Sequence, residues 1–291
     1  MSGLARTGGA WPGRLRTVPQ DPTYRFERPL WRAGVVRVAG VDEVGVAPTC
    51  GAVVAAAVIV RPNSRRIPGV RDSKTLSAAQ RERLAPEIRR RAVAVGVGAA
   101  SVDEIDRLNI YHATHLAMRR AIARLAGHDH VLVDGNRIAG FEADVGPYTA
   151  IVDGDTWSYS IACASVVAKV IRDRMMSRLA ARYPGYGWER NQGYATQEHR
   201  DAIRRIGLTP FHRRSFLALQ RTLAGDQMGL GLDGGPRDDG APASEVDSVR
   251  RLVPVMSARM APDVRDLVAD LAENLELALS LDPTAELLAG K

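Results

Sequence analysis

The chain has 291 residues, of which 45% are hydrophobic and 25% are charged, and its formal net charge is +7. This composition supports the full hydrophobic core of one domain with additions, or of two small domains. No apolar run reaches the roughly 18 residues of a membrane-spanning helix, so we exclude an integral membrane protein and expect no membrane partner.

The charge is unevenly distributed along the chain. Basic residues outnumber acidic ones over residues 1–225, whereas acidic residues outnumber basic ones over residues 226–291. A basic body that retains a few acids suits a polyanionic substrate held near metal ions. An arginine-rich composition that reflects a GC-rich genome explains the same excess equally well.

The cysteines and the first residues indicate the compartment. Cys50 and Cys163 stand among small apolar residues without a metal-ligand spacing. We expect both to be reduced and buried, as in a cytoplasmic protein. Residues 1–30 are rich in Gly, Arg and Pro and lack the apolar centre of a signal peptide, so they are predicted to form a disordered basic arm.

The first predicted elements are two buried strands joined by a short turn. Residues 38–45 read VAGVDEVG, and a second apolar run covers residues 52–60. Asp42 and Glu43 therefore stand side by side in an apolar strand, without a basic neighbour. Because burying an unpaired carboxylate costs several kcal/mol, a divalent cation is the natural compensation. These two acids are the first candidate metal ligands.

Helices with recognisable capping residues follow. A capping-box pattern at Ser77 opens a helix over residues 77–91, and the same pattern recurs at Ser101. Asn109 caps a longer helix whose apolar residues recur at helical spacing. The small apolar run over residues 92–100 predicts a third strand between these helices.

Two later strands each end in an acid. Residues 130–136 (HVLVDGN) and 149–155 (TAIVDGD) place Asp134 and Asp155 at or beyond the carboxyl ends of their strands. That edge is where open α/β sheets bind their ligands. Each acid alone would also suit an ordinary turn, but together with the adjacent pair they predict one common site.

A long helix is predicted over residues 158–182. One face of this helix is small and apolar, and Ser165, Lys169 and Arg172 lie on one polar side of it. A further helix is expected up to residue 206. A short last helix ends near residue 223.

The pattern divides the chain into a folded domain over residues 31–223 and a C-terminal extension. Residues 224–245 are rich in Gly, Asp and Pro and are predicted to be a flexible linker. Residues 246–291 form an acidic appendage with two helical patterns. We expect this appendage to pack on the body, on a second copy of the chain, or on another protein.

The four acids Asp42, Glu43, Asp134 and Asp155 predict a site for two metal ions, since one Mg²⁺ would not cancel their charge. Two ions about 4 Å apart can activate a water on one side of a phosphodiester and stabilise the leaving oxygen on the other. Ligands that are all oxygen favour Mg²⁺ or Mn²⁺ over zinc. The set therefore fits a catalytic site for phosphodiester hydrolysis.

Seven motifs in one order resemble those of bacterial ribonuclease H type 2, the ribonuclease HII family. They are AGVDEVG, DSK, LVDGN, DGD followed by SIACASVVAKVIRD, PGYG, GYATQEH and HRRSF. The resemblance implies an α/β fold of the RNase H-like kind, with a mixed five-stranded sheet flanked by helices and a C-terminal helical segment. It also implies an endonuclease that uses Mn²⁺ or Mg²⁺ to cleave the RNA strand of RNA–DNA hybrids and ribonucleotides embedded in duplex DNA. The cut lies on the 5′ side of the ribonucleotide and leaves 3′-hydroxyl and 5′-phosphate ends.

The resemblance also implies roles for individual residues. The four acids match the family's metal ligands, and Tyr194 matches the tyrosine that stacks on the sugar next to the ribonucleotide. Arg213 and Arg214 either touch phosphates or tie down the last helix. Further substrate-binding positions are the loop that reads the 2′-hydroxyl and the polar side chains that line the hybrid, namely Gly45, Val46, Ala47, Lys74, Ser165 and Lys169.

Three departures from the family pattern reduce basic character near the substrate. Val46-Ala47 replaces Arg-Gly, Asp153 stands where lysine is usual, and Asn191-Gln192 replaces His-Lys. Since contact with a 2′-hydroxyl distinguishes RNA from DNA, the change at Val46-Ala47 puts the selectivity for single ribonucleotides in doubt. Two alternatives stay open: a hybrid-binding protein with weakened catalysis, and a nuclease for long hybrids only. Ribonuclease H type 3 is disfavoured because the residues before the domain are too few for its N-terminal substrate-binding domain.

Overall fold

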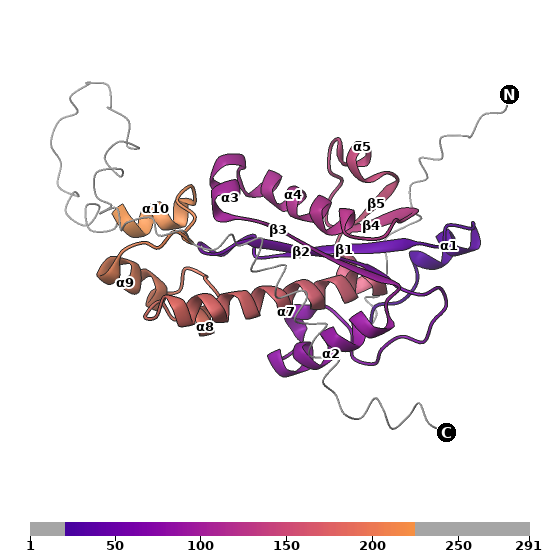
Figure 1. Cartoon of the computed structure of the whole chain (residues 1–291), viewed down its shortest axis with the longest axis horizontal. Helices are drawn as coiled ribbons and strands as arrows, with labels where there is room; N and C mark the ends of the chain where they lie inside the picture. Colours follow the sequence, from indigo (N-terminus) through magenta and orange to yellow (C-terminus); the bar gives the residue numbers. More distant parts are fainter. Residues whose placement is uncertain (1–20, 225–291) are drawn as a thin grey trace, which may run out of the picture.

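The computed structural model describes residues 21–224, and its centre is one mixed five-stranded sheet between two layers of helices (Figure 1). The strand order is β3-β2-β1-β4-β5. The strand β2 is antiparallel to both β1 and β3, while β4 is parallel to β1 and β5 is parallel to β4. The expected sheet is therefore confirmed. The strands are β1 (Val38–Val44), β2 (Val53–Ile59), β3 (Ala94–Ala100), β4 (His130–Asp134) and β5 (Tyr148–Ile151).

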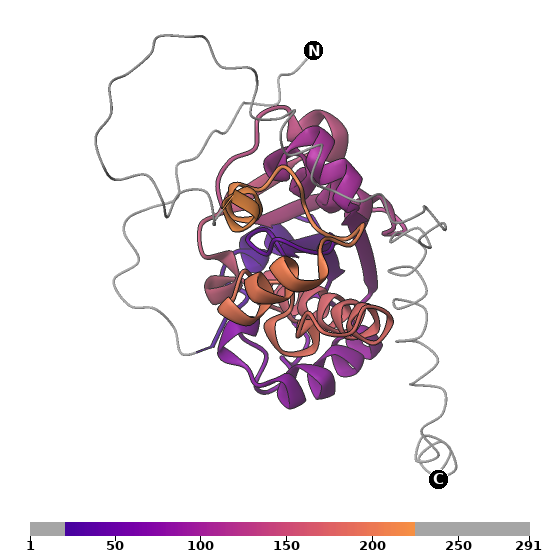
Figure 2. The same cartoon turned by 90° about the vertical axis from the view of Figure 1, so that its left-hand side faces the viewer.

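The helices cover both faces of the sheet and one of its ends. On one face lie α2 (Ala78–Arg91) and α7 (Tyr159–Arg182), and on the other lie α3 (Val102–Leu108), α4 (Ile110–Ala123) and α5 (Phe141–Val145) (Figure 1). Figure 2, viewed from the end beyond β1, shows the C-terminal helical segment gathered there. This segment consists of α8 (Trp188–Asn191), α9 (Gln197–Ile206) and α10 (Leu217–Ala224). The remaining elements are α1 (Glu27–Arg32), α6 (Gly154–Trp157) and the 3₁₀ turn η1 (Ser73–Thr75).

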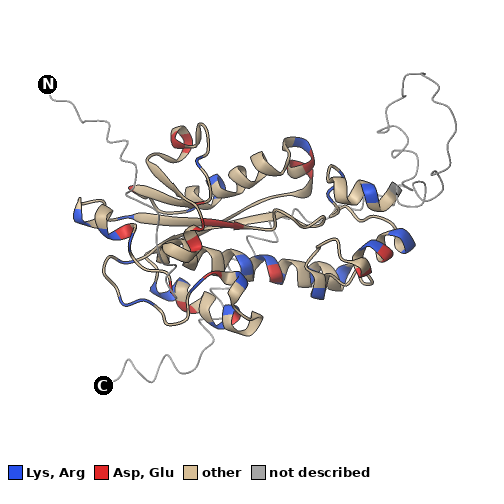
Figure 3. Cartoon of the chain, turned by 180° about the vertical axis from the view of Figure 1, so that it is seen from behind, with Lys and Arg blue, Asp and Glu red and all other residues tan. Residues whose placement is uncertain are grey.

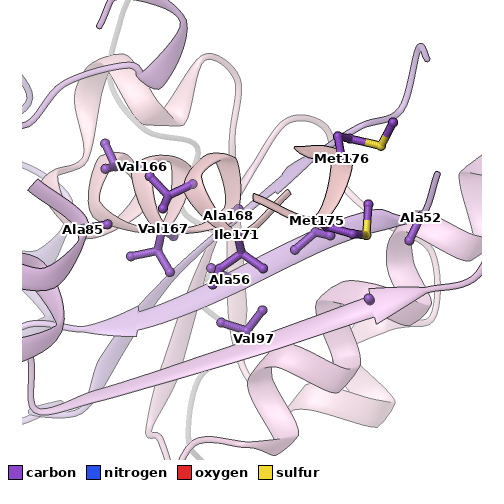
Figure 4. Packing of buried hydrophobic residues seen from close by; sticks show 14 of the residues in the cluster. Ala52, Ala56, Ala85, Val97, Val166, Val167, Ala168, Ile171, Met175 and Met176 are labelled. Atoms are coloured by element: carbon purple, nitrogen blue, oxygen red, sulfur yellow. The ribbon is translucent and has the colours of Figure 1, made fainter. Parts of the chain in front are cut away.

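The hydrophobic core lies on both faces of β2, because every residue of this strand is buried. Side chains alternate along a strand, so Val54 and Ala56 pack in the cluster that contains α7, while Val53 and Ala55 pack in the cluster that contains α4. Figure 4 shows the first cluster, with Ala168, Ile171 and Met175 of α7 directly over the sheet.

The closeness of α7 to β1 depends on Gly40. A Cβ atom added at Gly40 would lie 2.2 Å from the carbonyl carbon of Ser160, so any side chain there would push the helix away from the strand. Since Asp42 and Glu43 follow on the same strand, this close contact also fixes the distance between α7 and the first two acids.

The helix starts confirm the predicted capping residues. Ser77 and Ser101 each open a helix with a complete capping box, and the Asn109 side chain accepts a hydrogen bond from the N–H of His112. These caps satisfy backbone donors that have no partner inside the helix. The helix boundaries of this region were therefore readable from single residues.

The structure corrects the boundary of the N-terminal arm, which was predicted to be disordered up to residue 30. Residues 27–32 form α1, and Tyr24 and Phe26 are buried. The buried Glu27 carboxylate accepts hydrogen bonds from Ser158 Oγ at 2.7 Å and from Ser160 N at 2.9 Å, at the start of α7. The arm before residue 21, the linker beyond its first residue and the appendage over residues 246–291 lie outside the described residues.

Two further expectations concern the cysteines and the membrane. Cys50 and Cys163 are both buried and carry free thiols, as expected. Within residues 21–224, none of the helices combines the length and the apolar character that crossing a membrane requires.

Candidate active site

The four predicted acids come from three segments that the sheet brings together. Asp42 and Glu43 lie near the end of β1, Asp134 ends the neighbouring parallel strand β4, and Asp155 lies in α6 just after β5. Asp42 and Asp155 are each only 5% exposed. The N–H of Gly154 donates to Asp134 Oδ1 at 2.6 Å, which ties the β4 acid to the segment that carries Asp155. The acids therefore share one edge of the sheet, as the parallel pairing predicted.

The electrostatics of these acids show unbalanced negative charge. Burial, followed by Glu43 and Asp134, raises the pKa of Asp42 well above its ordinary value. Burial and then Asp134 raise the pKa of Glu43 to about 7, and burial and then Asp72 raise the pKa of Asp155 to about 6. Burial also raises the pKa of Asp134. Each carboxylate makes its neighbours harder to ionise, so the cluster needs positive charge from elsewhere.

The donor set fits a hard divalent cation. All four candidate ligands are carboxylates, and Mg²⁺ and Mn²⁺ prefer oxygen donors. Across residues 21–224, no group of three or more His, Cys, Asp or Glu side chains has an arrangement that could hold a metal ion. The fit therefore depends on the chemistry of the donors and on the raised pKa values of the acids.

Lys74 and Ser165 lie against the acids. Lys74 Nζ is 4.0 Å from Asp155 Oδ2, and the Lys74 side chain is 81% exposed. Ser165 is buried on α7, where it donates to Ser73 Oγ at 2.9 Å and lies close enough to Asp42 to oppose the rise in its pKa. The helix α7 thus reaches the first acid through a hydroxyl group.

Lys169, one turn further along α7, is already paired. Its Nζ lies 2.5 Å from Asp173 Oδ1, and Asp173 also accepts from Arg81 at 3.2 Å. The Lys169 side chain is only 18% exposed. A phosphate would therefore have to compete with an existing ion pair for this lysine.

The β1–β2 loop, residues 45–52, contains the candidate positions for reading the 2′-hydroxyl. Gly45 has a φ angle of +94°, a conformation that favours glycine. Val46 is 38% exposed and Ala47 is also exposed, whereas residues 48–52 are buried. The side chains that depart from the family pattern therefore point outward at the surface.

The burial of Arg213 contradicts the expectation that it touches phosphates and leaves the alternative, that it ties down the last helix, in place. Arg213 is fully buried, and its guanidinium donates to four carbonyl oxygens of the β1–β2 loop. The distances are 2.5 Å to Gly45, 2.9 Å to Val46, 2.6 Å to Pro48 and 2.9 Å to Gly51. Its neighbour Arg214 is exposed; the backbone N–H of Arg214 donates to Asp106 Oδ2 at 3.0 Å, and its carbonyl accepts from Gln220 Nε2 at 3.2 Å.

A second buried arginine, Arg172 of α7, holds the other half of the loop. It is 1% exposed and donates to the carbonyl oxygens of Cys50 at 3.1 Å and Ala52 at 3.3 Å. The same guanidinium donates to the carbonyl of Gln192 at 3.1 Å, so it links the loop to the segment before Tyr194. The sequence placed Arg172 on the polar side of the helix but gave no sign of this role.

Tyr194, the candidate for sugar stacking, is 48% exposed at the end of a tight turn. Asn191 shapes this turn, because its buried amide donates to the carbonyl of Tyr186 and accepts from the N–H of Gly193. Thr49 then joins the turn to the β1–β2 loop by donating to the carbonyl of Gly193 at 2.9 Å. The departure at Asn191 thus lies inside the protein and has a structural role.

Two buried histidines, His199 and His212, lie behind Tyr194. The sequence suggested only a phosphate contact or an anchor of the last helix for His212, and no role for His199. The N–H of Thr209 donates to His212 Nδ1 at 2.9 Å, so the proton of neutral His212 is on Nε2. That proton faces His199 Nε2 at 3.2 Å, which also accepts from Trp188. His199 Nδ1 must then donate to the carbonyl of Tyr194, 2.8 Å away. The bonds therefore fix both tautomers in a chain that ends at Tyr194.

The other residues that the sequence reasoning missed are Ser73 and Asp72. Both belong to the DSK motif, from which only Lys74 was selected. Asp72 lies close enough to Asp155 to raise its pKa, and Ser73 accepts from Ser165, so the whole motif lies against the acids. Figure 3 shows acidic residues on β1 between the helical layers, with basic residues along α7 and the neighbouring helices.

Comparisons with solved structures show the fold. Ribonuclease H2 from Pyrococcus horikoshii matches with a TM-score of 0.56 and 23% identity over 66% of this chain and 99% of that one. Ribonuclease HII from Archaeoglobus fulgidus, solved in a complex with PCNA, matches with a TM-score of 0.54 and 26% identity over 62% of this chain and 95% of that one. The RNase H-like fold is therefore confirmed.

Sequence comparisons agree. Ribonuclease HII of Thermosynechococcus vestitus is 56% identical over 194 residues, which are 66% of this chain and 89% of that relative. Ribonuclease HII of Ruegeria pomeroyi is 51% identical over 214 residues, or 72% of this chain and 88% of that relative. The family model for ribonuclease HII matches residues 39–219, which include all four acids. The chain therefore belongs to the ribonuclease HII family, the ribonuclease H enzymes that cleave the RNA of RNA–DNA hybrids.

Proposed function

We propose that this chain cleaves both RNA–DNA hybrids and single ribonucleotides embedded in duplex DNA, with Mg²⁺ or Mn²⁺ as cofactor. The cut lies on the 5′ side of the ribonucleotide and leaves 3′-hydroxyl and 5′-phosphate ends. The observation that carries the proposal is the convergence of four carboxylates from three segments, with pKa values raised by burial and by one another.

The four acids Asp42, Glu43, Asp134 and Asp155 would hold the metal ions. When bound, these ions neutralise the carboxylates and polarise both the scissile phosphodiester and the attacking water. The Gly154 N–H keeps Asp134 oriented, and the Glu43 N–H, which donates to Asp42 Oδ1 at 2.7 Å, does the same for Asp42. The chain itself thus supplies a fixed set of oxygen donors.

The substrate would lie across the same edge of the sheet. Exposed Lys74 and Arg214 are placed to meet phosphates, and the exposed ring of Tyr194 offers a face for a sugar. Lys169 can contribute once a phosphate replaces Asp173 as its partner. The β1–β2 loop would read the 2′-hydroxyl through its backbone.

The second candidate function is hybrid binding with weakened catalysis, and the departures motivate it. Asp153 adds a negative charge that contributes to the raised pKa of Asp134. Val46 and Ala47, however, change only exposed side chains. If backbone groups recognise the 2′-hydroxyl, changes of exposed side chains at residues 46 and 47 are tolerated. We therefore favour the catalytic function.

One assay separates these functions. Purified protein is incubated with Mg²⁺ or with Mn²⁺ and three substrates: a duplex with one ribonucleotide, a long hybrid and an all-DNA duplex. We expect cleavage of the first two, no cleavage of the third, and loss of all cleavage in EDTA. Binding without cleavage would favour the second candidate, and cleavage of the hybrid alone would exclude action on single ribonucleotides.

A protein partner is a separate proposal. The structure from Archaeoglobus fulgidus is a complex with PCNA, and residues 246–291 of this chain are acidic with an apolar stripe. We propose that this appendage mediates self-association or binding to another protein. A monomeric mass in light scattering, unchanged when residues 246–291 are removed, would argue against self-association.

A further inference from the structure

The carbonyl groups of the β1–β2 loop point into the protein. Those of residues 45, 46, 48 and 51 accept from Arg213, and those of residues 50 and 52 accept from Arg172. Two guanidinium groups thus orient six peptide groups of an eight-residue loop, and no other side chain in residues 21–224 contacts so many carbonyls of one loop.

This arrangement dictates where the N–H groups of the loop point. In a trans peptide the C=O of one residue and the N–H of the next lie on opposite sides, and residues 21–224 contain no cis peptide bond. The inward carbonyls of Gly45 and Val46 therefore turn the N–H groups of Val46 and Ala47 outward. The described structure offers neither N–H an acceptor. Both are free to donate to a bound molecule.

The two arginines are unusual because they are buried without an ion pair in the described part of the chain, although Asp173 and Asp106 lie near enough to oppose the lowering by burial of the pKa of Arg172 and of Arg213, respectively. Arg172 and Arg213 are 1% and 0% exposed, and neither forms an ion pair with a carboxylate within residues 21–224. Burying charges without counterions costs several kcal/mol, and apolar side chains would fill the same space at a lower cost. Their benefit must therefore lie in the directional bonds that they make.

We propose that Arg172 and Arg213 are positioning residues that set the ribonucleotide selectivity of the site. They hold the N–H groups of Val46 and Ala47 toward the bound sugar, where these groups donate to its 2′-oxygen. Each guanidinium also polarises the peptides that it binds, which strengthens their N–H groups as donors. The inference rests on the proposed function, since it needs a sugar bound at the β1–β2 loop.

The test uses Arg172→Lys and Arg213→Lys in the full chain. Lysine retains the charge but donates from a single point, so it cannot reproduce the forked contacts. The matched control is Arg120→Lys, because Arg120 also holds a carbonyl, that of Ala99 at 2.8 Å, together with Glu104, on the opposite face of the sheet. All three variants lose the several hydrogen bonds of a guanidinium group, but only Arg172→Lys and Arg213→Lys lose them at the β1–β2 loop.

The measurement is the dissociation constant, in EDTA, for a duplex with one ribonucleotide and for the same duplex made entirely of DNA. We expect the preference for the ribonucleotide to fall about tenfold in both loop variants, as for the loss of hydrogen bonds to a polar group. The affinity for the all-DNA duplex and the preference of the Arg120→Lys variant should not change. An unchanged preference in the loop variants, an equal loss of affinity for both duplexes, or the same effect in the control would overturn the proposal.

A second measurement avoids variants that fold poorly. In ¹⁵N-labelled protein without substitutions, the amide protons of Val46 and Ala47 should move downfield with the ribonucleotide-containing duplex and not with the all-DNA duplex. Equal shifts with both duplexes would contradict the role of these donors. If the unsubstituted protein does not distinguish the duplexes at all, the proposed function itself fails; if it does and the lysine variants do too, only the role of the arginines fails.

Discussion

The end of β1 and the β1–β2 loop that follows it differ in how their buried charges are compensated. At Asp42 and Glu43 the anions face other anions, and their pKa values rise because the protein supplies too little positive charge. In the β1–β2 loop, a few residues later, carbonyl oxygens satisfy the donors of Arg172 and Arg213, which are buried even more deeply. The acidic end is incomplete without an external cation, whereas the arginine end is complete in itself. The acidic arrangement suits the binding of a metal ion, and the arginine arrangement suits a loop that is held in one conformation.

The largest effect is expected from a substitution in the acidic cluster. Asp134→Asn removes one negative charge from the candidate metal ligands but leaves an oxygen that still accepts from the Gly154 N–H. We expect kcat to fall by about a thousandfold or more, with binding of an RNA–DNA hybrid retained. Single-turnover cleavage and fluorescence anisotropy measure the two quantities.

The control for that substitution is Asp144→Asn on α5, since Asp144 is an exposed acid that pairs with Arg119. Cleavage by this variant should match that of the parent. If the Asp134→Asn variant cuts as fast as the Asp144→Asn variant, the assignment of Asp134 to the metal site is wrong.

The second prediction concerns the β1–β2 loop where it contacts Arg172. In Gly45→Ala the new Cβ would lie 2.2 Å from Arg172 Nε, and the residue would keep a φ angle of +94°. The clash and the backbone strain together should lower the free energy of unfolding by about 3 kcal/mol. Urea denaturation followed by circular dichroism measures it.

Gly127→Ala separates the two causes, because Gly127 has a φ angle of +87° but nothing within 4 Å of a new Cβ. This variant should lose only about 1 kcal/mol. Equal losses in the two glycine variants would mean that Arg172 does not restrict the loop.

The third prediction concerns the neutral histidines behind Tyr194. Burial and then His199 lower the pKa of His212 to about 3, from an ordinary value of 6.5. Below pH 6.5 the unfolded chain therefore takes up a proton that the folded chain refuses. The free energy of unfolding should fall by about 1.4 kcal/mol per pH unit from this residue as the pH drops from about 6 towards 3.

Urea unfolding at several pH values between 7 and 5 gives the slope, and His212→Gln should flatten it. A wild-type slope that persists in the variant would show that other groups cause the pH dependence. A flattened slope would sharpen the comparison, since the interior beside the β1–β2 loop would then accept guanidinium charge but reject imidazolium charge.

The smallest effect is expected when residues 46 and 47 are changed to the Arg-Gly of the family pattern. Val46→Arg combined with Ala47→Gly changes two exposed side chains, while the inward carbonyls and outward N–H groups stay in place. We expect kcat/KM on a single-ribonucleotide duplex to change by less than about threefold. A gain of about tenfold or more would show that side chains at these positions, rather than the backbone, determine selectivity.

The sequence was most informative where a residue acts within its own segment. Ser77, Ser101 and Asn109 cap their helices through neighbouring backbone groups, so a local pattern sufficed. The acids were also predictable, because Asp134 and Asp155 follow apolar runs whose strands or strand ends meet at one edge of the sheet. Parallel pairing then brings them to Asp42 and Glu43.

The sequence was least informative where a side chain bonds to a distant backbone. Arg213 stands in a polar stretch, and its acceptors lie more than 160 residues earlier, so nothing local distinguishes it from exposed Arg214. Glu27 is similar, because its partners Ser158 and Ser160 are 131 and 133 residues away. A carbonyl acceptor leaves no mark in the sequence, since every residue has one.

The helix α7 has a consequence for how the enzyme measures its substrate. Ser165 touches the acidic cluster, and Arg172 touches the β1–β2 loop, on the same rigid helix. Seven helical residues span about 10 Å, so α7 fixes the distance between the acidic cluster and the β1–β2 loop, the two places that we propose for bond cleavage and for sugar recognition. One residue inserted between Ser165 and Arg172 would rotate the arginine by about 100° around the helix axis. Arg172 could then no longer reach the β1–β2 loop, although no residue of the acidic cluster or of the loop would have changed.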